Sequence, residues 1–475
     1  MSVPRAYAVV VSSILFLSSL YALANESPEQ RLAAAIRYET VSYQDPARID
    51  YEQFRKFNRF LERSFPRVFD TLLIEMVNEY SLLMTWQGVD PSLPPVLFTA
   101  HSDVVPIEPG TEPDWPHPPF AGAISQGNVY GRGTLDDKQG LMGWLEAAEG
   151  LLAEHFSPHR TLVFAFGHDE EIGGRQGARK MAEVMAGRGM QFVWMIDEGG
   201  LIVADNPLVP DRPVALVNIA EKAYVTLTLV ATGEGGHSSS PPEISTIGRL
   251  AAALARIEAN PFPARLSEPV VAMLEAVAPH AQQPERFIFS NLWLTGPLVA
   301  SQMSGERLTS GFVRSTTALT MFNAGVKENV VPQRAEAKIN FRLLPGDTVE
   351  SLIERIEGIV DDPEVTIESG NWDGLPGIAN KDGEGFAVIA QAVAAVYPQA
   401  LVAPSLLTAT TDTRHYIELA RDQYRFHGVL IDSAQTPSIH GTGEYISVAS
   451  YLRSIDIARE ILLGAAARDA PVAGQ

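Results

Sequence analysis

The chain has 475 residues, of which 46% are apolar and 20% are charged, and its formal net charge is −21 at pH 7. This length exceeds what one hydrophobic core normally supports, so we expect roughly two or three domains. The strong negative charge argues against nucleic acid and anionic membranes as partners. Because the chain has no cysteine, any metal must be bound by His, Asp and Glu.

Residues 1–24 have the pattern of an export signal. Arg5 precedes an apolar stretch that runs from Ala6 to about Leu20, and the segment "ALA" at 22–24 fits the rule for a cleavage site. The stretch is also near the length that spans a bilayer, so an uncleaved anchor is one alternative and a buried helix is another. We expect a signal peptide, and therefore a periplasmic or secreted protein.

The next segments alternate between helical and strand patterns up to residue 219. Helical periodicity occurs in 27–40, 51–65, 140–155 and 177–189, and apolar strand-like runs occur in 81–88, 94–103, 161–171 and 191–200. The strand-like runs are continuous rather than alternating, which is typical of strands covered on both faces. We therefore predict an α/β fold with a mixed, largely parallel sheet sandwiched between helices, formed by 25–219 and 371–475.

A second pattern covers residues 220–370. The strand-like run 223–233 alternates apolar and polar residues, a helical segment 246–260 follows, and 261–320 has no clear pattern. Two strand-like runs, the helical segment 349–360 and a last strand then complete the β-α-β-β-α-β order of ferredoxin-like domains. We expect an inserted ferredoxin-like α+β domain that serves as a lid or as a dimerisation domain.

Polar side chains follow the predicted strands of the larger domain at the points where those strands end. They are His101 and Asp103, Asp136, Glu170 and Glu171, Asp197, and His440 near the C-terminus. Ligands of open α/β sheets bind at the carboxyl ends of the strands, so these side chains are expected to meet there. Two histidines and several carboxylates suit a divalent cation such as Zn²⁺, Mn²⁺ or Co²⁺.

A pair of such cations about 3.5–4 Å apart polarises a carbonyl and activates water in many hydrolases. One carboxylate must then bridge the cations, and another must remain free to carry a proton. The adjacent residues Glu170 and Glu171 allow one to bind metal while the other acts as the base.

Eight short motifs together carry a resemblance to a known family. They are "HSDVVP", "YGRGTLDDK", "GHDEE", "DEGG", "GHSS", "NVVP", "TDTRH" and "HGTGE". In this order they resemble the motifs of the aminoacylase/carboxypeptidase metallopeptidases, with the nearest likeness in carboxypeptidase S and the secreted N-fatty-acyl-amino-acid synthase/hydrolase. The resemblance extends over nearly the whole chain after the signal, and it implies two zinc ions, with cobalt or manganese as substitutes.

The resemblance implies a role for each matching metal-site residue. His101 and His440 would each bind one zinc, Asp136 would bridge the two, and Glu171 and Asp197 would complete the ligand sets. Glu170 would be the general base, and Asp103 would orient His101 or tune the base. Each of these residues also has a plainer interpretation: Asp136 as a helix cap, Asp103, Asp197 and His440 as turn residues, and His101 as an ordinary histidine.

Three further residues lie outside these ligand sets. By the resemblance, His237 would stabilise the oxyanion, reaching across a homodimer in relatives, Arg414 would bind the substrate carboxylate, and Asn329 would contact substrate. The alternatives are a turn histidine, a surface ion pair and a strand-end turn. Four other histidines, His117, His168, His415 and His427, are interpreted mostly as structural.

We therefore predict an exported dinuclear zinc hydrolase acting on a small molecule. It would hydrolyse the amide of N-acyl amino acids, or remove a C-terminal residue from short peptides. One alternative is a dipeptidase with no preference for an acyl chain, and another is a non-catalytic metal-binding or ligand-binding protein with the same fold. The segment 261–320 is apolar enough to line an acyl site, and it would equally suit a lid or a dimer contact.

Overall fold

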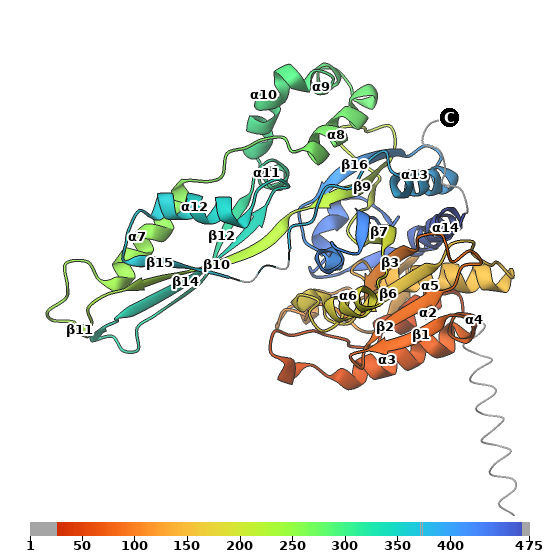
Figure 1. The fold of residues 1–475 in the computed structure, drawn as a ribbon, viewed down its shortest axis with the longest axis horizontal. Coiled ribbons are helices and arrows are strands. Elements are labelled where there is room, and N and C mark those ends of the chain that lie inside the picture. Colours follow the sequence, from red (N-terminus) through yellow and green to blue (C-terminus); the bar gives the residue numbers. More distant parts are fainter. Residues whose placement is uncertain (1–25, 371, 373, 468–475) are drawn as a thin grey trace, which may run out of the picture. The chain divides into compact units, whose positions relative to one another are not determined.

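A computed structural model describes residues 26–370, 372 and 374–467 of the chain (Figure 1). The chain forms two compact units: unit 1 comprises 1–217, 380–402 and 418–475, and unit 2 comprises 218–379 and 403–417. The predicted signal segment 1–24 lies outside the described residues. None of the helices in the described ranges combines the length and hydropathy that crossing a membrane requires.

Unit 1 contains most of a large mixed sheet flanked by helices. Among the described residues the strands follow the order β1-β2-β6-β3-β7-β17-β9-β8-β18, with β16 paired to β9. The pairs β6–β3, β3–β7 and β7–β17 are parallel, whereas β1–β2 and β2–β6 are antiparallel. This arrangement confirms the predicted α/β fold with a mixed, largely parallel sheet.

The strands of this sheet are β1 (Leu73–Val77), β2 (Ser81–Trp86), β3 (Val96–His101), β6 (Leu162–Gly167), β7 (Phe192–Asp197), β8 (Ile202–Val203), β9 (Val214–Glu221), β16 (Leu401–Leu407), β17 (Ala420–Arg425) and β18 (Leu430–Ile431). A small sheet pairs β4 (Ala123–Ser125), β5 (Asn128–Tyr130) and β19 (Tyr445–Ser447). The chain passes between the two units at four points: within β9, at 379/380, within β16 and at 417/418.

The helices of unit 1 are α2 (Pro28–Ile36), α3 (Tyr51–Ser64), α4 (Pro66–Thr71), α5 (Lys138–Ala153), α6 (Ala178–Gly187), α13 (Glu384–Val396) and α14 (Val448–Ala465), with short 3₁₀ turns η1 (Pro46–Arg48), η2 (Glu112–Asp114), η3 (Glu170–Ile172) and η6 (Ser433–Ser438). Every residue of β3 and β6 is buried, as their continuous apolar sequences predict. The core between α5 and these strands includes Phe98, whose ring lies 4.9 Å from Trp144 of α5 and 5.2 Å from Phe164.

Unit 2 contains a four-stranded antiparallel sheet in the order β12-β14-β10-β15 (Figure 1). Its elements are β10 (Ala223–Thr232), α7 (Thr246–Ala259), β12 (Thr316–Ala324), β14 (Arg334–Leu343), α12 (Val349–Val360) and β15 (Val365–Ser369). This is the predicted ferredoxin-like order. Alternate residues of β10, such as Val225, Leu227 and Leu229, are fully buried beneath α7 and α12.

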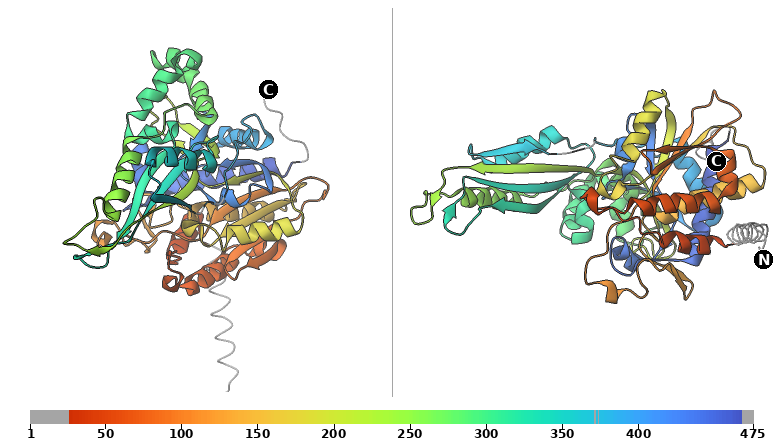
Figure 2. Two further views of the ribbon diagram at one scale, coloured as in Figure 1. Left: turned by 60° about the vertical axis from the view of Figure 1, so that its left-hand side comes forward. Right: turned by 90° about the horizontal axis from the view of Figure 1, so that it is seen from below.

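The segment expected to lack a pattern is helical in the structure. It contains α8 (Glu268–Val277), η4 (Ala278–His280), α9 (Glu285–Phe289), α10 (Leu292–Ser304) and α11 (Arg307–Val313), and Figure 2 shows this helical group from two further directions. Our expectation of an irregular stretch was wrong. Prolines interrupt the helical periodicity here; Pro297 even lies inside α10, where it removes a backbone donor and lowers helix propensity.

Candidate metal and active site

Three neighbouring strands of unit 1 bring four of the predicted side chains to one edge of the sheet. The strands lie in the order β6-β3-β7, and His101, the last residue of β3, pairs in register with Gly167 at the end of β6. Glu170 and Glu171 follow β6 in the turn η3, and Asp197 ends β7. Because parallel strands end at a common edge, residues far apart in sequence meet there.

Asp136 contacts both of the histidines that were predicted to bind metal. Its Oδ1 lies 2.9 Å from Nε2 of His101, and its Oδ2 lies 3.0 Å from Nε2 of His440. The same His440 nitrogen lies 3.2 Å from Oε2 of Glu171. A single carboxylate therefore has one oxygen directed at each histidine, which is the arrangement that a carboxylate bridging two cations requires.

The electrostatics of this cluster suit positively charged ligands. Hydrogen bonds to Asp136 and then to Glu171 raise the pKa of His440 to about 10. Burial lowers the pKa of His101, but Glu198 and then Asp103 and Asp136 outweigh it and hold that pKa well above the usual range. The carboxylates around both imidazoles thus favour positive charge at this place, which divalent cations would also supply.

The donor set fits a pair of divalent cations by composition as well. One possible ligand group comprises His101, Asp136 and Glu171, and a second comprises His101, Glu170 and Glu198, with donor atoms in each group within 4.8 Å of one another. Among the described residues, Oε1 of Glu171 is buried and has no hydrogen-bond partner. An unpaired buried carboxylate oxygen is costly unless a cation or a water molecule contacts it.

The residue directly after β7, Glu198, was not selected by sequence analysis. Within the described residues, Glu198 belongs to the second possible ligand group, and its Oε1 lies 3.4 Å from Nε2 of His101. Neither of the two ligand groups contains Asp197. Asp197 is buried, and its Oδ1 accepts a hydrogen bond from the backbone N–H of Glu198 at 3.0 Å. Asp197 as a ligand stays a prediction, and the adjacent "DE" pair was the available signal for Glu198.

Asp103 connects the first strand end to the acidic turn. Its side chain is fully buried; Oδ1 accepts from the backbone N–H of Glu170 at 3.1 Å, and Oδ2 accepts from that of Glu171 at 3.2 Å. Oδ1 also lies 3.4 Å from Nδ1 of His101. The predicted orienting residue thus contacts the metal-facing histidine and also holds the backbone of the predicted base.

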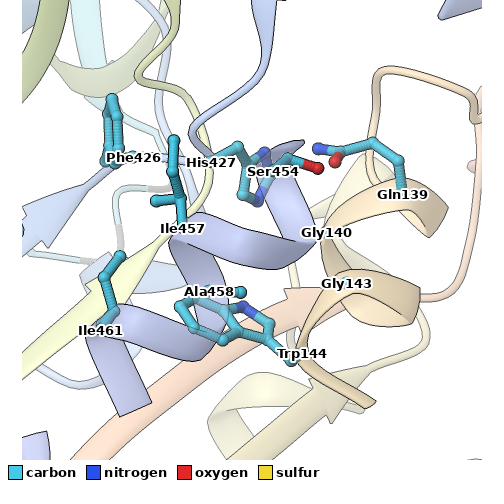
Figure 3. A pocket seen from close by; sticks show the side chains of 10 residues that line it. All are labelled: Gln139, Gly140, Gly143, Trp144, Phe426, His427, Ser454, Ile457, Ala458 and Ile461. Atoms are coloured by element: carbon cyan, nitrogen blue, oxygen red, sulfur yellow. The ribbon is translucent and has the colours of Figure 1, made fainter. Parts of the chain in front are cut away.

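Asp137 contacts the backbone of His101 and also lies close to His427, a histidine from a distant part of the sequence. Its Oδ2 accepts from the backbone N–H of His101 at 3.2 Å, and its Oδ1 lies 3.0 Å from Nε2 of His427. A Cβ at Gly140 would approach both of these atoms within 2.5 Å, so only glycine fits there. Figure 3 shows His427 and Gly140 beside a cavity of about 10 Å³, near the smallest size that holds a water.

The acidic triplet Asp169, Glu170 and Glu171 divides into two residues with oxygens near the cluster and one, Asp169, that closes the loop. Asp169 accepts hydrogen bonds from the backbone N–H groups of Gln176 and Gly177, each at 2.7 Å. This side chain therefore ties the turn after β6 to the start of α6.

His168, next to the triplet, has a structural environment. It is buried, its Nδ1 lies 2.6 Å from Oγ of Ser81, and its ring packs edge-on to those of Phe54 and Tyr80. Burial lowers its pKa to about 4, against the opposing charge of Asp103. The folded chain therefore keeps this imidazole neutral at physiological pH.

We expect His168 to make the chain less stable in mild acid. The unfolded chain binds the proton at about pH 6.5, so this contribution is complete above that pH and is lost as the pH falls toward 4, by about 3 kcal/mol. Urea unfolding of wild type and His168→Gln between pH 7 and pH 4 measures the difference. The variant should show a shallower decline; equal declines would contradict the assignment.

His237 and Asn329 lie together in unit 2. His237 is an exposed residue of β11 (Gly236–His237), which pairs with β13 (Val330–Val331), and the N–H of Ser238 donates to the backbone carbonyl of Asn329 at 3.2 Å. The Nδ1 of His237 lies 2.8 Å from Oγ of Ser239. The structure thus brings together two of the predicted substrate-facing residues, both with exposed side chains.

Arg414 lies in the turn η5 (Asp412–His415) of unit 2. Its Nη2 is 3.8 Å from Oδ1 of Asp412, and its side chain is largely buried. The turn is anchored by Glu221, a fully buried residue that accepts from both the N–H and the hydroxyl of Thr411. Glu221 was not identified from the sequence, where it appears as an isolated carboxylate at the end of a strand.

Residues 97–464 match the family model described as peptidase family M20/M25/M40. The chain belongs to this family. The resemblance drawn from the eight motifs is thereby confirmed, and the chain is a metallohydrolase of the carboxypeptidase type.

Among its relatives, the N-fatty-acyl-amino acid synthase/hydrolase PM20D1 of Bos taurus is 39% identical over 92% of this chain and 88% of its own. The probable carboxypeptidase S-like 2 of Dictyostelium discoideum is 37% identical over 93% and 85%. Carboxypeptidase S of Saccharomyces cerevisiae is 30% identical over 91% and 83%. The family therefore includes relatives named for acyl amino acids and relatives named as carboxypeptidases.

Two solved structures show the same fold at low sequence identity. The M20 metallo-carboxypeptidase Sso-CP2 of Sulfolobus solfataricus has a TM-score of 0.65 at 16% identity and covers 92% of this chain and 98% of its own. Human carnosine dipeptidase 1 has a TM-score of 0.63 at 16% identity, covering 92% and 95%. These two likenesses concern the fold alone.

Proposed function

We propose that the chain is an exported dinuclear zinc amidohydrolase. It would hydrolyse the amide bond of N-acyl amino acids or release the C-terminal residue of short peptides. The observation that carries this proposal is Asp136, whose two carboxylate oxygens are directed at His101 and His440 respectively. The N-terminal sequence pattern supports export, and the names of the relatives support an acyl amino acid or a short peptide as substrate.

His101, Asp136, Glu171 and His440 would hold the cations, with Glu198 or Asp197 completing the set. When bound, two such cations polarise the scissile carbonyl and make water more acidic. Cobalt or manganese could replace zinc, since the donors are imidazoles and carboxylates. Glu170, beside His101 and Glu198, would accept the proton of the attacking water and pass it to the leaving nitrogen.

Asp103 would keep this base in position. Because it accepts from the backbone N–H groups of Glu170 and Glu171, it holds the turn η3 in the geometry that separates the two side chains. One glutamate would then move the proton while its neighbour binds metal. A pure binding protein has no need of a base at this position, so the presence of Glu170 argues against the non-catalytic alternative.

Three further residues would contact the substrate, as the family resemblance implies. Arg414 would bind the carboxylate of the amino-acid product in two parallel hydrogen bonds, and His237 with Asn329 would stabilise the oxyanion. The edge strand β12 pairs only with β14 among the described strands and exposes Met321 and Phe322. This edge would suit the homodimer in which His237 serves the partner subunit.

A substrate panel tests the proposal. The purified, zinc-loaded chain is assayed with N-lauroyl and N-acetyl amino acids and with dipeptides, with Arg414→Lys as a variant whose KM for every carboxylate substrate should rise. Hydrolysis of N-acyl amino acids supports the proposal. Turnover of dipeptides alone would favour the dipeptidase alternative, and bound zinc with no turnover of any substrate would favour the binding protein.

A further inference from the structure

A buried ion pair joins the two loops that carry Asp136 and His440. Arg132 and Glu444 are 2% and 0% exposed, and Nη1 of Arg132 donates to Oε2 of Glu444 at 2.7 Å. Arg132 lies four residues before Asp136, and Glu444 lies four residues after His440. The pair therefore links sequence segments that are about 300 residues apart, at the point where their metal-facing side chains meet.

Each partner of the pair also forms hydrogen bonds with the backbone of these loops. Glu444 accepts from the N–H groups of Gly133 and Leu135, the latter at 2.7 Å. Nη2 of Arg132 donates to the backbone carbonyls of His440 and Gly441 at 3.2 and 3.0 Å. The glutamate thus holds the Asp136 loop, and the arginine holds the backbone of His440 itself.

The two candidate metal-binding histidines are supported very differently. His101 ends a central strand, and its side chain is 2% exposed. The side chain of His440 is 51% exposed, and the residue has a positive φ of 58°, a conformation that few non-glycine residues adopt without local support. The position of His440 therefore depends on what holds its loop.

We propose that the Arg132–Glu444 pair positions His440 against Asp136 and thereby sets how tightly the chain holds the cation between those two residues. The cation beside His101 depends on it less. Arg132 and Glu444 are positioning residues, since their hydrogen bonds go to each other and to the backbone of the two loops. The inference rests on the dinuclear site of the proposed function and adds two residues of the motifs "YGRGTLDDK" and "HGTGE" that had no role.

Removing one partner alone would leave a buried charge without its counter-ion, and the chain could then fail to fold. The informative variant is the double substitution Arg132→Met/Glu444→Leu, which replaces both charges by apolar groups of similar size. A matched control is Arg160→Met/Glu384→Leu, at another largely buried arginine–glutamate pair of unit 1, which joins the loop before β6 to α13.

The full chain is loaded with Co²⁺, and bound metal and its affinity are followed by elemental analysis, chelator competition and the visible spectrum. Wild type and the control variant should bind two cations. In the double variant the dissociation constant of the cation between Asp136 and His440 should rise about 10–100-fold, which is typical when a residue that orients a metal ligand is removed. The cation beside His101 should remain bound. Circular dichroism verifies that each variant is folded.

A double-mutant cycle separates positioning from general stability. In a His440→Ala background, the same double substitution should lower metal affinity much less than it does in wild type, because the ligand that Arg132 holds is already gone and only the support of the Asp136 loop is lost. An unchanged affinity for the cation between Asp136 and His440 in the folded double variant, or a wild type that binds one cation only, would overturn the inference. Two tightly bound cations without hydrolysis in wild type would instead contradict the proposed function and leave this inference standing.

Discussion

Replacing Glu170 by glutamine is expected to lower kcat by about 10²–10⁴-fold without removing metal from the chain. Glutamine keeps the shape of the side chain but cannot accept a proton, so only the proton transfer is lost. The backbone N–H of residue 170, which donates to Asp103, is unaffected by the change. Steady-state kinetics with the preferred substrate, together with metal analysis of the same preparation, measures both quantities.

The exposed residue Glu62 provides the control, since Glu62→Gln makes the same chemical change on the surface. Glu198→Gln provides the contrast: if Glu198 is a ligand, that variant loses metal as well as activity. An activity of Glu170→Gln within about threefold of wild type would exclude Glu170 as the base. Loss of metal from Glu170→Gln would place it among the ligands instead.

Replacing Asp136 by asparagine should remove the dinuclear site itself. An amide presents one oxygen and one N–H₂ group, so it cannot direct an acceptor at both His101 and His440, as the carboxylate does. We expect the cation beside His440 to be lost. The affinity for the cation beside His101 should fall by more than the 10–100-fold that is typical when a residue orienting a metal ligand is removed. Hydrolysis should fall below detection.

Thermal unfolding checks this prediction without an activity assay. A cation that binds only the folded chain at 100 times its Kd stabilises it by about 2.7 kcal/mol, so zinc should raise the Tm of wild type and have little effect on Asp136→Asn. Asp211→Asn, at an exposed aspartate, should respond as wild type does. An equal zinc-dependent rise in both proteins would show that Asp136 does not bridge the cations.

Much of the fold could be predicted because its patterns are local. Continuous apolar runs marked β3, β6 and β7, and alternation marked β10, since strand burial follows directly from residue order. The helices α8 to α11 were missed because prolines obscure their period, and β1 was missed because its exposed residues, such as Leu73 and Met76, leave no buried face. These elements depend on packing against the rest of the chain rather than on their own sequence.

The choice between Asp197 and Glu198 shows where sequence reasoning stops. Successive side chains at a strand end point in different directions, so two adjacent acids do not lie at the same distance from His101. The sequence contains both, and only the folded backbone at this strand end decides which one lies nearer the imidazole. In the structure Glu198 does so, at 3.4 Å, while Asp197 accepts a backbone hydrogen bond.

By itself, the sequence determined the family, the α/β class and the residue types that gather after the strands, because these depend on composition and on spacing along the chain. Only the tertiary structure decided that Asp136 faces both histidines, that Asp103 holds the acidic turn, and that Arg132 and Glu444 join two loops. These contacts connect residues tens to hundreds of positions apart. Their geometry follows from strand order and register, which no local pattern of residues records.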